Sequence, residues 1–223
     1  MPVFERDVNL MATLRSELFK IPAGDDKDDL VWELDGTEAH LQKFKSHLAR
    51  KSFDKISEYE SYQNMKEHQM KIIIDYGQKW ETHKNKESQS FQFGEAGLSN
   101  YGATCLFLSS SLTDAQLVDI LGCEQVSKLK AGDMVMHDIM LYCDDVKQDW
   151  VHSYYCIWAA LKLFIAKFPH ISEVLIRSDG AGNFKNTSMI FALPKLSQIL
   201  QIRIIEMSIS EGGNGKDYTD SLV

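Results

Sequence analysis

Two aspartates stand where a buried strand is expected to give way to a turn. Asp75 follows the β-branched run Ile72–Ile74, and Asp179 comes shortly after the apolar run Val174–Ile176 and opens a glycine-rich turn. The carboxyl ends of strands in open α/β sheets are where ligands and metals bind. If the two strands are parallel neighbours about 5 Å apart, the two carboxylates can share a hard cation such as Mg²⁺. The competing interpretation is that Asp179 only caps the helix that follows it.

A third acid is needed to hold a pair of ions, and the end of the chain offers three candidates. They are Glu211, Asp217 and Asp220. Asp217 and Asp220 are three residues apart, so a helix would carry both on roughly one face. Three carboxylates with two Mg²⁺ ions can activate water or a 3′-hydroxyl and stabilise the leaving oxygen, which is the chemistry of phosphoryl transfer.

The elements that must position these acids alternate between strands and helices from residue 70 onward. Three strands with short connections favour an antiparallel meander, and the helical crossovers after them make the later strands parallel. The expected fold is therefore α/β, a ribonuclease-H-like mixed five-stranded sheet flanked by helices, in which the first and fourth strands pair at the centre. The predicted strands are Met70–Tyr76, Tyr101–Ser109, Met134–Cys143, the run around Val174–Ile176 and Arg203–Met207; the predicted helices are Thr113–Leu121, Trp150–Phe168 and Phe184–Leu200, the last interrupted or kinked at Pro194.

Residues 1–69 form a separate, helical N-terminal region in this interpretation. An amphipathic pattern over Met11–Ile21 stops at a Pro-Ala-Gly sequence, and a solvated run of acidic residues follows. A second helical pattern runs from Thr37 to about Gln69. Its basic residues indicate either a helix that binds nucleic acid or another partner, or a solvated helix packed on the next domain; they are Lys43, Lys45, Arg50, Lys51 and Lys55.

Composition limits the function classes. The 223 residues are 44% hydrophobic and 25% charged, which is typical of a globular protein. The net charge of −8 argues against nucleic-acid binding by the whole surface, but it is compatible with a carboxylate-rich metal site. No stretch approaches the roughly 20 apolar residues of a membrane span, and the N-terminus lacks the layout of a signal peptide, so an intracellular protein without a membrane partner is expected.

The cysteines and histidines show no pattern typical of a zinc site. The four cysteines, Cys105, Cys123, Cys143 and Cys156, include no C-x-x-C pair, and the seven histidines do not cluster in the sequence. The cysteines are expected to be reduced, buried and hydrophobic in role, and a zinc enzyme is not expected.

Four short motifs together resemble one known family. They are Asp75-Tyr76 after an apolar strand, Gln89-Ser90-x-x-Phe93-Gly94, Ser178-Asp179-Gly180-Ala181-Gly182-Asn183-Phe184-Lys185-Asn186, and Gly213-Asn214-Gly215-Lys216-x-x-x-Asp220. This set is similar to the ribonuclease-H-like DDE/DDD transposase domains found in uncharacterised proteins of animal and protist genomes. The resemblance covers about residues 70–223, and its motif around Asp179 is the most specific part.

The resemblance implies a metal-dependent polynucleotidyl transferase or nuclease. Asp75, Asp179 and Asp220 would be the catalytic triad that holds two Mg²⁺ or Mn²⁺ ions. Lys185, Asn186 and Lys216 would contact nucleic acid. The implied partner is DNA, the implied location is the nucleus of a eukaryotic cell, and a homo-oligomer is compatible with this assignment.

Two departures from the family pattern keep other functions open. Asn214 replaces the family's histidine, and the chain ends three residues after Asp220, so the last helix is expected to be short and the domain truncated. One alternative is a catalytically inactive, transposon-derived domain that binds DNA or protein. The other is a 3′–5′ exonuclease, although that class usually begins with Asp-x-Glu and the strand here reads Asp75-Tyr76-Gly77.

Overall fold

The computed structural model describes residues 2–77, 98–144 and 147–210. The chain divides into two compact units, residues 1–55 and 56–223, and the boundary lies within the long helix α2 (Asp25–Gln63). Residue 69, where the composition changes and a boundary was expected, is the first residue of the sheet. Among the described residues, no helix is both long enough and apolar enough to cross a membrane.

The first unit is a helical hairpin made by α1 (Pro2–Phe19) and the first part of α2. The break expected at Pro22-Ala23-Gly24 is present, and the acidic run after it is solvent-exposed as expected and forms the first turn of α2. Three acids in the first turn of α2 are favourable because the N-terminal end of a helix carries partial positive charge. The hairpin is also held by Arg15, whose guanidinium lies 2.6 Å from Asp35 and whose Nε donates to Glu38 at 3.1 Å.

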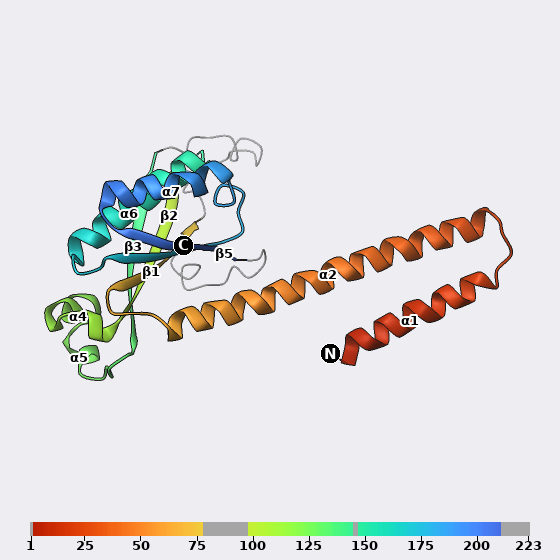
Figure 1. The fold of residues 1–223 in the computed structure, drawn as a ribbon, viewed down its shortest axis with the longest axis horizontal. Coiled ribbons are helices and arrows are strands. Elements are labelled where there is room, and N and C mark those ends of the chain that lie inside the picture. Colours follow the sequence, from red (N-terminus) through yellow and green to blue (C-terminus); the bar gives the residue numbers. More distant parts are fainter. Residues whose placement is uncertain (1, 78–97, 145–146, 211–223) are drawn as a thin grey trace, which may run out of the picture. The chain divides into compact units, whose positions relative to one another are not determined.

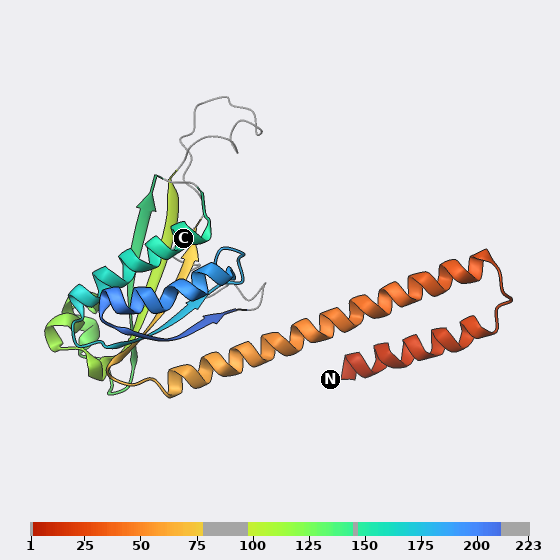
Figure 2. The same cartoon turned by 45° about the horizontal axis from the view of Figure 1, so that its top comes forward.

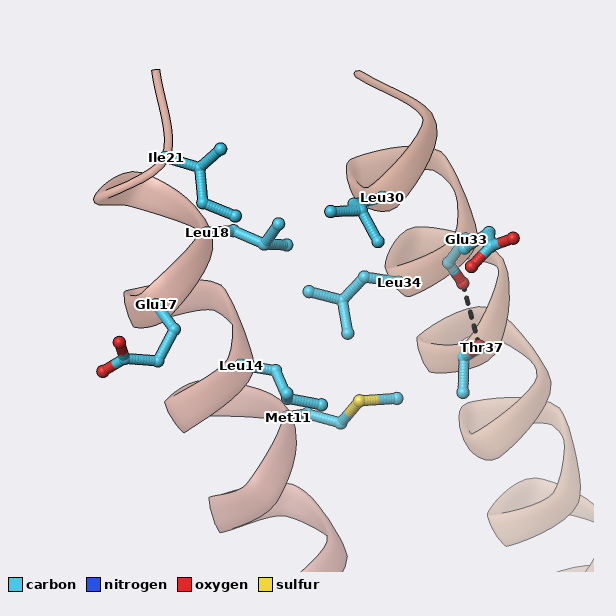
Figure 3. Close-up of a pocket in the computed structure, with 9 residues that line it drawn as sticks. All are labelled: Met11, Leu14, Glu17, Leu18, Ile21, Leu30, Glu33, Leu34 and Thr37. Atoms are coloured by element: carbon cyan, nitrogen blue, oxygen red, sulfur yellow. Dashed lines mark hydrogen bonds between the residues drawn. The ribbon is translucent and has the colours of Figure 1, made fainter. Parts of the chain in front are cut away.

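The interior of this hairpin is apolar. Leucines from the two helices point toward one another across a groove of about 370 Å³ (Figure 3). Thr37 donates to the carbonyl of Glu33 at 2.8 Å, so its hydroxyl is satisfied within α2. The groove lining is mostly aliphatic and offers no cluster of catalytic groups; it consists of Met11, Leu14, Glu17, Leu18, Ile21, Leu30, Glu33, Leu34 and Thr37.

The second unit is built on a mixed five-stranded sheet with the order β3-β2-β1-β4-β5. β1 pairs antiparallel with β2, and β2 pairs antiparallel with β3. β1 pairs parallel with β4, and β4 pairs parallel with β5. The strands are β1 (Gln69–Tyr76), β2 (Ser99–Leu108), β3 (Met134–Cys143), β4 (Glu173–Ser178) and β5 (Arg203–Ile209).

One face of this sheet carries the main core. Helices α6 (Trp150–Lys167) and α7 (Thr187–Leu200) lie side by side over it in both views (Figures 1 and 2). Ile72 and Ile74 of β1 face these helices, and Ile157, Leu161 and Phe164 of α6 pack against the sheet with Met189 and Leu196 of α7. The short segments η1 (Ser109–Ser111), α4 (Asp114–Leu121) and α5 (Cys123–Val126) connect β2 to β3.

The opposite face of the sheet receives the last turns of α2. Strand side chains alternate between faces, so Lys71 and Arg177 point away from the α6/α7 core. Both are buried, and each has a partner on α2: Lys71 donates to Ser61 at 2.7 Å, and Arg177 lies 3.3 Å from Glu58. Arg177 is therefore paired with a carboxylate and Lys71 is hydrogen-bonded, which offsets the cost of burying these two side chains.

Most predicted elements are confirmed within two residues. The strands at Met70–Tyr76 and Met134–Cys143, the helix from Trp150 and the cap at Thr113 agree with the structure. The helix expected over Phe184–Leu200 differs at its start. It begins at Thr187 and not at Phe184, because residues 182–184 form a turn, and helical structure continues through Pro194.

Glu173 is the first residue of β4 and lies at the end of the sheet opposite the two aspartates. Its carboxylate lies 2.6 Å from Arg203, accepts a hydrogen bond from Gln69 at 2.7 Å and lies 3.4 Å from His68. The bond from Gln69, followed by the charges of Arg203 and His68, lowers the pKa of Glu173 below its ordinary value. These contacts tie the starts of β1, β4 and β5 together.

Replacing Glu173 with glutamine is expected to make stability less dependent on acid pH. A carboxyl group with a lowered folded pKa stabilises the protein above its unfolded pKa, and this contribution disappears as the pH falls through the folded pKa. Urea unfolding at several pH values should therefore show a stability difference between wild type and Glu173→Gln near neutrality that shrinks on acidification. Glu124→Gln, which changes a highly exposed carboxylate, is the control. A difference that stays constant with pH would contradict the expectation.

Candidate functional site

Asp75 and Asp179 lie at neighbouring strand ends. The parallel register pairs Ile74 of β1 with Ser178 of β4, so Asp75 is the next residue of β1 and Asp179 directly follows the last residue of β4. Parallel neighbours are separated by about 4.8 Å. Ile74 packs in the α6/α7 core, so the alternation of side chains along β1 directs Asp75 to the other face. Both aspartates are half-buried and stand at the ends of adjacent parallel strands.

The described hydrogen bonds of the two carboxylates are to nearby backbone. Oδ1 of Asp75 accepts from the N–H of Tyr76 at 2.7 Å, and Oδ1 of Asp179 accepts from the N–H of Ala181 at 3.1 Å. Asp179 therefore holds the glycine-rich turn in place. The interpretation that it caps the next helix is wrong, because α7 starts at Thr187 and its cap is Asn186.

Gly102 and Ser210 flank the two aspartates among the described residues. The β2 residue opposite Asp75 is Gly102, which has no side chain. On the other side, Ser210 donates from its N–H to the carbonyl of Ser178 at 2.9 Å, so the chain leaves the sheet beside Asp179. The remaining predicted site residues lie outside the described residues; they are Glu211, Lys216, Asp217 and Asp220, together with Asn214 and the Gln89–Gly94 motif.

Lys185 and Asn186, the two other predicted contacts for nucleic acid, follow the turn. Lys185 is exposed, and its N–H donates to the carbonyl of Ala181 at 3.1 Å. Asn186 is the N-cap of α7, since its Oδ1 accepts a hydrogen bond from the N–H of Ser188 at 2.8 Å. Of the two, the exposed Lys185 has the side chain better placed to meet a phosphate.

Replacing Asn186 with alanine is expected to destabilise the protein by about 1 kcal/mol, because alanine cannot accept the hydrogen bond at the start of α7. Asn186→Asp restores an acceptor and should retain most of the stability. Chemical unfolding of the two variants measures the difference. Equal stability of Asn186→Ala and wild type would show that the cap does not contribute.

An aromatic stack joins the Asp179 turn to the end of β1. Phe184 is completely buried, and its ring lies 5.8 Å from that of Tyr76 at an interplanar angle of 29°. The ring of Tyr76 also lies 5.1 Å from that of Tyr101, in a T-shaped arrangement. In the sequence, Phe184 was noted only as part of a motif. Its position directly after a glycine-rich turn was the one sequence feature that could have indicated a buried side chain.

The hydroxyl of Tyr76 belongs to a polar network at the start of α6. It lies 2.8 Å from Nδ1 of His152 and 3.1 Å from Oγ of Ser153. Ser153 in turn donates to the carbonyl of Asp149 at 2.9 Å and accepts from Asn183 at 3.0 Å. Burial raises the pKa of Tyr76 well above its ordinary value, so the phenol stays protonated and can donate. The network connects β1, α6 and the turn after β4.

The expectation about cysteines and histidines needs correction. Cys143, His152 and Cys156 place their ligand atoms within 4.8 Å of one another. The residues come together because the end of β3 packs beside the first turns of α6. Cys105 and Cys156 are buried as expected, whereas Cys143 is half-buried and Cys123 is exposed. Sequence spacing alone could not show this cluster.

The chain has no match among known proteins in three comparisons. No family model, no curated protein and no solved structure matches it. The residues themselves, above all Asp75 and Asp179, therefore have to indicate the function.

Proposed function

We propose that this chain is a metal-dependent phosphoryl transferase that acts on DNA, of the transposase or nuclease type. The observation that carries the proposal is the pair of half-buried carboxylates, Asp75 and Asp179, at adjacent ends of two parallel central strands. Oxygen ligands so arranged suit a hard divalent cation. In a eukaryotic cell, such a protein would act in the nucleus.

The sheet supports the proposal at the level of the fold. Its order β3-β2-β1-β4-β5, with β2 antiparallel to its neighbours and β4 and β5 parallel to β1, is the arrangement expected for a ribonuclease-H-like domain. In this arrangement β1 is central, and its carboxyl end lies next to that of β4. The resemblance in the sequence motifs assigns the catalytic acids to these same two strand ends.

Carboxylate oxygens are suitable ligands for the two Mg²⁺ or Mn²⁺ ions that this function requires. Asp75 and Asp179 would hold the metal, and Asp220, which lies outside the described residues, would be the third ligand. Mg²⁺ bound there would supply an activated water or 3′-hydroxyl and stabilise the leaving oxygen. The hydrogen bond from Ala181 fixes Asp179 in the glycine-rich turn, and exposed Lys185 can attract a DNA phosphate.

Incubating the purified chain with supercoiled plasmid and short DNA duplexes tests this function. Nicked or joined products are expected with Mg²⁺ or Mn²⁺ and not with a chelator. Stepwise shortening of single strands from their 3′ ends would point to the exonuclease alternative. A folded protein that leaves every DNA intact with either metal would overturn the enzyme and favour an inactive DNA- or protein-interaction domain.

A further inference from the structure

A second group of ligand atoms lies at the carboxyl end of β3, separate from the aspartate pair. Sγ of Cys143 lies 3.8 Å from Sγ of Cys156, and Sγ of Cys156 lies 3.7 Å from Nε2 of His152. All three atoms fall within 4.8 Å of one another. Two sulfurs and an imidazole nitrogen are soft or intermediate ligands, which suit Zn²⁺ and not Mg²⁺.

Two separations in the cluster fit a tetrahedral zinc ion. With Zn–S bonds of about 2.3 Å and a Zn–N bond of about 2.0 Å, tetrahedral angles place two sulfurs about 3.8 Å apart and a sulfur and a nitrogen about 3.5 Å apart. The two separations in the structure agree with these values. A disulfide would instead require the two sulfurs to lie about 2.05 Å apart.

The scaffold holds the three residues in place. Cys143 is the last residue of β3, and His152 and Cys156 are four apart on α6, so they lie on the same face of the helix. The start of α6 is fixed by Asp149, whose carboxylate accepts from the N–H groups of Val151 and His152 at 3.0 Å each. Two rigid elements thus present the ligands.

The hydrogen-bond geometry is compatible with a metal-binding tautomer of His152. When Ser153 donates its hydroxyl hydrogen to the carbonyl of Asp149, its oxygen accepts from the Tyr76 hydroxyl. In that arrangement Nδ1–H of His152 donates to the oxygen of Tyr76 across 2.8 Å. Nε2 is then unprotonated and faces Cys156. A ring N–H held by a second residue is the usual support of a metal-binding histidine.

We propose that Cys143, His152 and Cys156 bind a Zn²⁺ ion, with a water molecule in the fourth position. On binding, the two thiols become thiolates and release two protons, and Nε2 contributes its lone pair, so no oxidant or reductant is involved. The ion would fasten the end of β3 to α6. Through the bond between His152 and Tyr76 it would also fix the end of β1. The inference does not depend on DNA cleavage.

Metal analysis of the whole chain tests the site. After purification with added zinc and removal of excess metal, wild type is expected to retain about one equivalent of Zn²⁺. Cobalt in place of zinc should give the visible absorption of tetrahedral Co²⁺ and sulfur-to-cobalt charge-transfer bands. Cys143→Ser and Cys156→Ser should lose both signals. Cys123→Ser, which changes an exposed cysteine outside the cluster, is the matched control and should keep them.

Tyr76→Phe tests the support of the ligand. It removes the acceptor for Nδ1–H and is expected to weaken zinc binding by about 10- to 100-fold, with the same stoichiometry at saturation. Chelator titration of wild type gives a test that does not depend on whether the variants fold. Removing zinc should lower the melting temperature of wild type. The proposal is overturned if folded wild type holds no zinc and gives no cobalt–thiolate bands. It is equally overturned if thiol titration finds Cys143 and Cys156 joined as a disulfide.

Discussion

Asp179→Asn is expected to reduce metal-dependent cleavage of DNA by at least about 100-fold, since the loss of a metal ligand removes several kcal/mol of transition-state stabilisation. Asparagine keeps an oxygen that can accept from the N–H of Ala181, so the glycine-rich turn should survive. Asp75→Asn is expected to have a similar effect. The double variant should be little worse than either single one, because ligands of one metal act as a unit.

The control for both variants is Asp138→Asn, an equal change of charge on an exposed residue of β3. It should cleave DNA like wild type. Thermal unfolding with and without Mn²⁺ gives a second measurement, because a ligand at 100 times its Kd stabilises the folded state by about 2.7 kcal/mol. Wild type and Asp138→Asn should show the shift, and the two site variants should not. Equal cleavage by all four proteins would mean that the aspartate pair is not the active site.

Phe184→Ala is expected to destabilise the protein by about 3–5 kcal/mol. The ring of Phe184 is fully buried and stacks on Tyr76, so its removal leaves a cavity between the Asp179 turn and the end of β1. The loss is comparable to the whole stability of many domains, and the variant is expected to be partly unfolded at ambient temperature. Urea unfolding followed by circular dichroism measures the change.

Phe191→Ala is the matched control for this prediction. Phe191 lies on α7 with 79% of its surface exposed, and the same truncation there is expected to change the unfolding free energy by less than about 0.5 kcal/mol. If both variants have the same stability, then Phe184 is not the anchor of the turn. Leucine at position 184 should recover part of the loss, because it refills some of the cavity.

Asp75 and Tyr76 connect the two proposed metal sites. They are consecutive residues at the end of β1, so their side chains point to opposite faces of the sheet. Asp75 lies at the strand end next to Asp179. Tyr76 packs in the core and is hydrogen-bonded to His152. Zinc removal is therefore expected to loosen the strand end that carries Asp75, although zinc and magnesium would occupy different ligand sets.

The sequence by itself determined the strands, the main helices and the two aspartates. A β-branched run that ends in a carboxylate, as at Ile74 and Asp75, predicts a buried strand with a polar residue at its end. The alternation of strands and helices then limited the order of the sheet, since crossover connections make strands parallel. The pairing of β1 with β4 followed from this order.

Only the tertiary structure decided which distant residues meet. The start of α7 depended on Asn186 taking the cap while Asp179 held the turn, and both residues are good caps by sequence. The meeting of Cys143 with His152 and Cys156 depended on how the end of β3 packs against α6. Local sequence patterns indicate whether a segment is a helix or a strand and where it begins and ends. Side-chain contacts between two elements depend on how the elements pack, which no single segment of the sequence specifies.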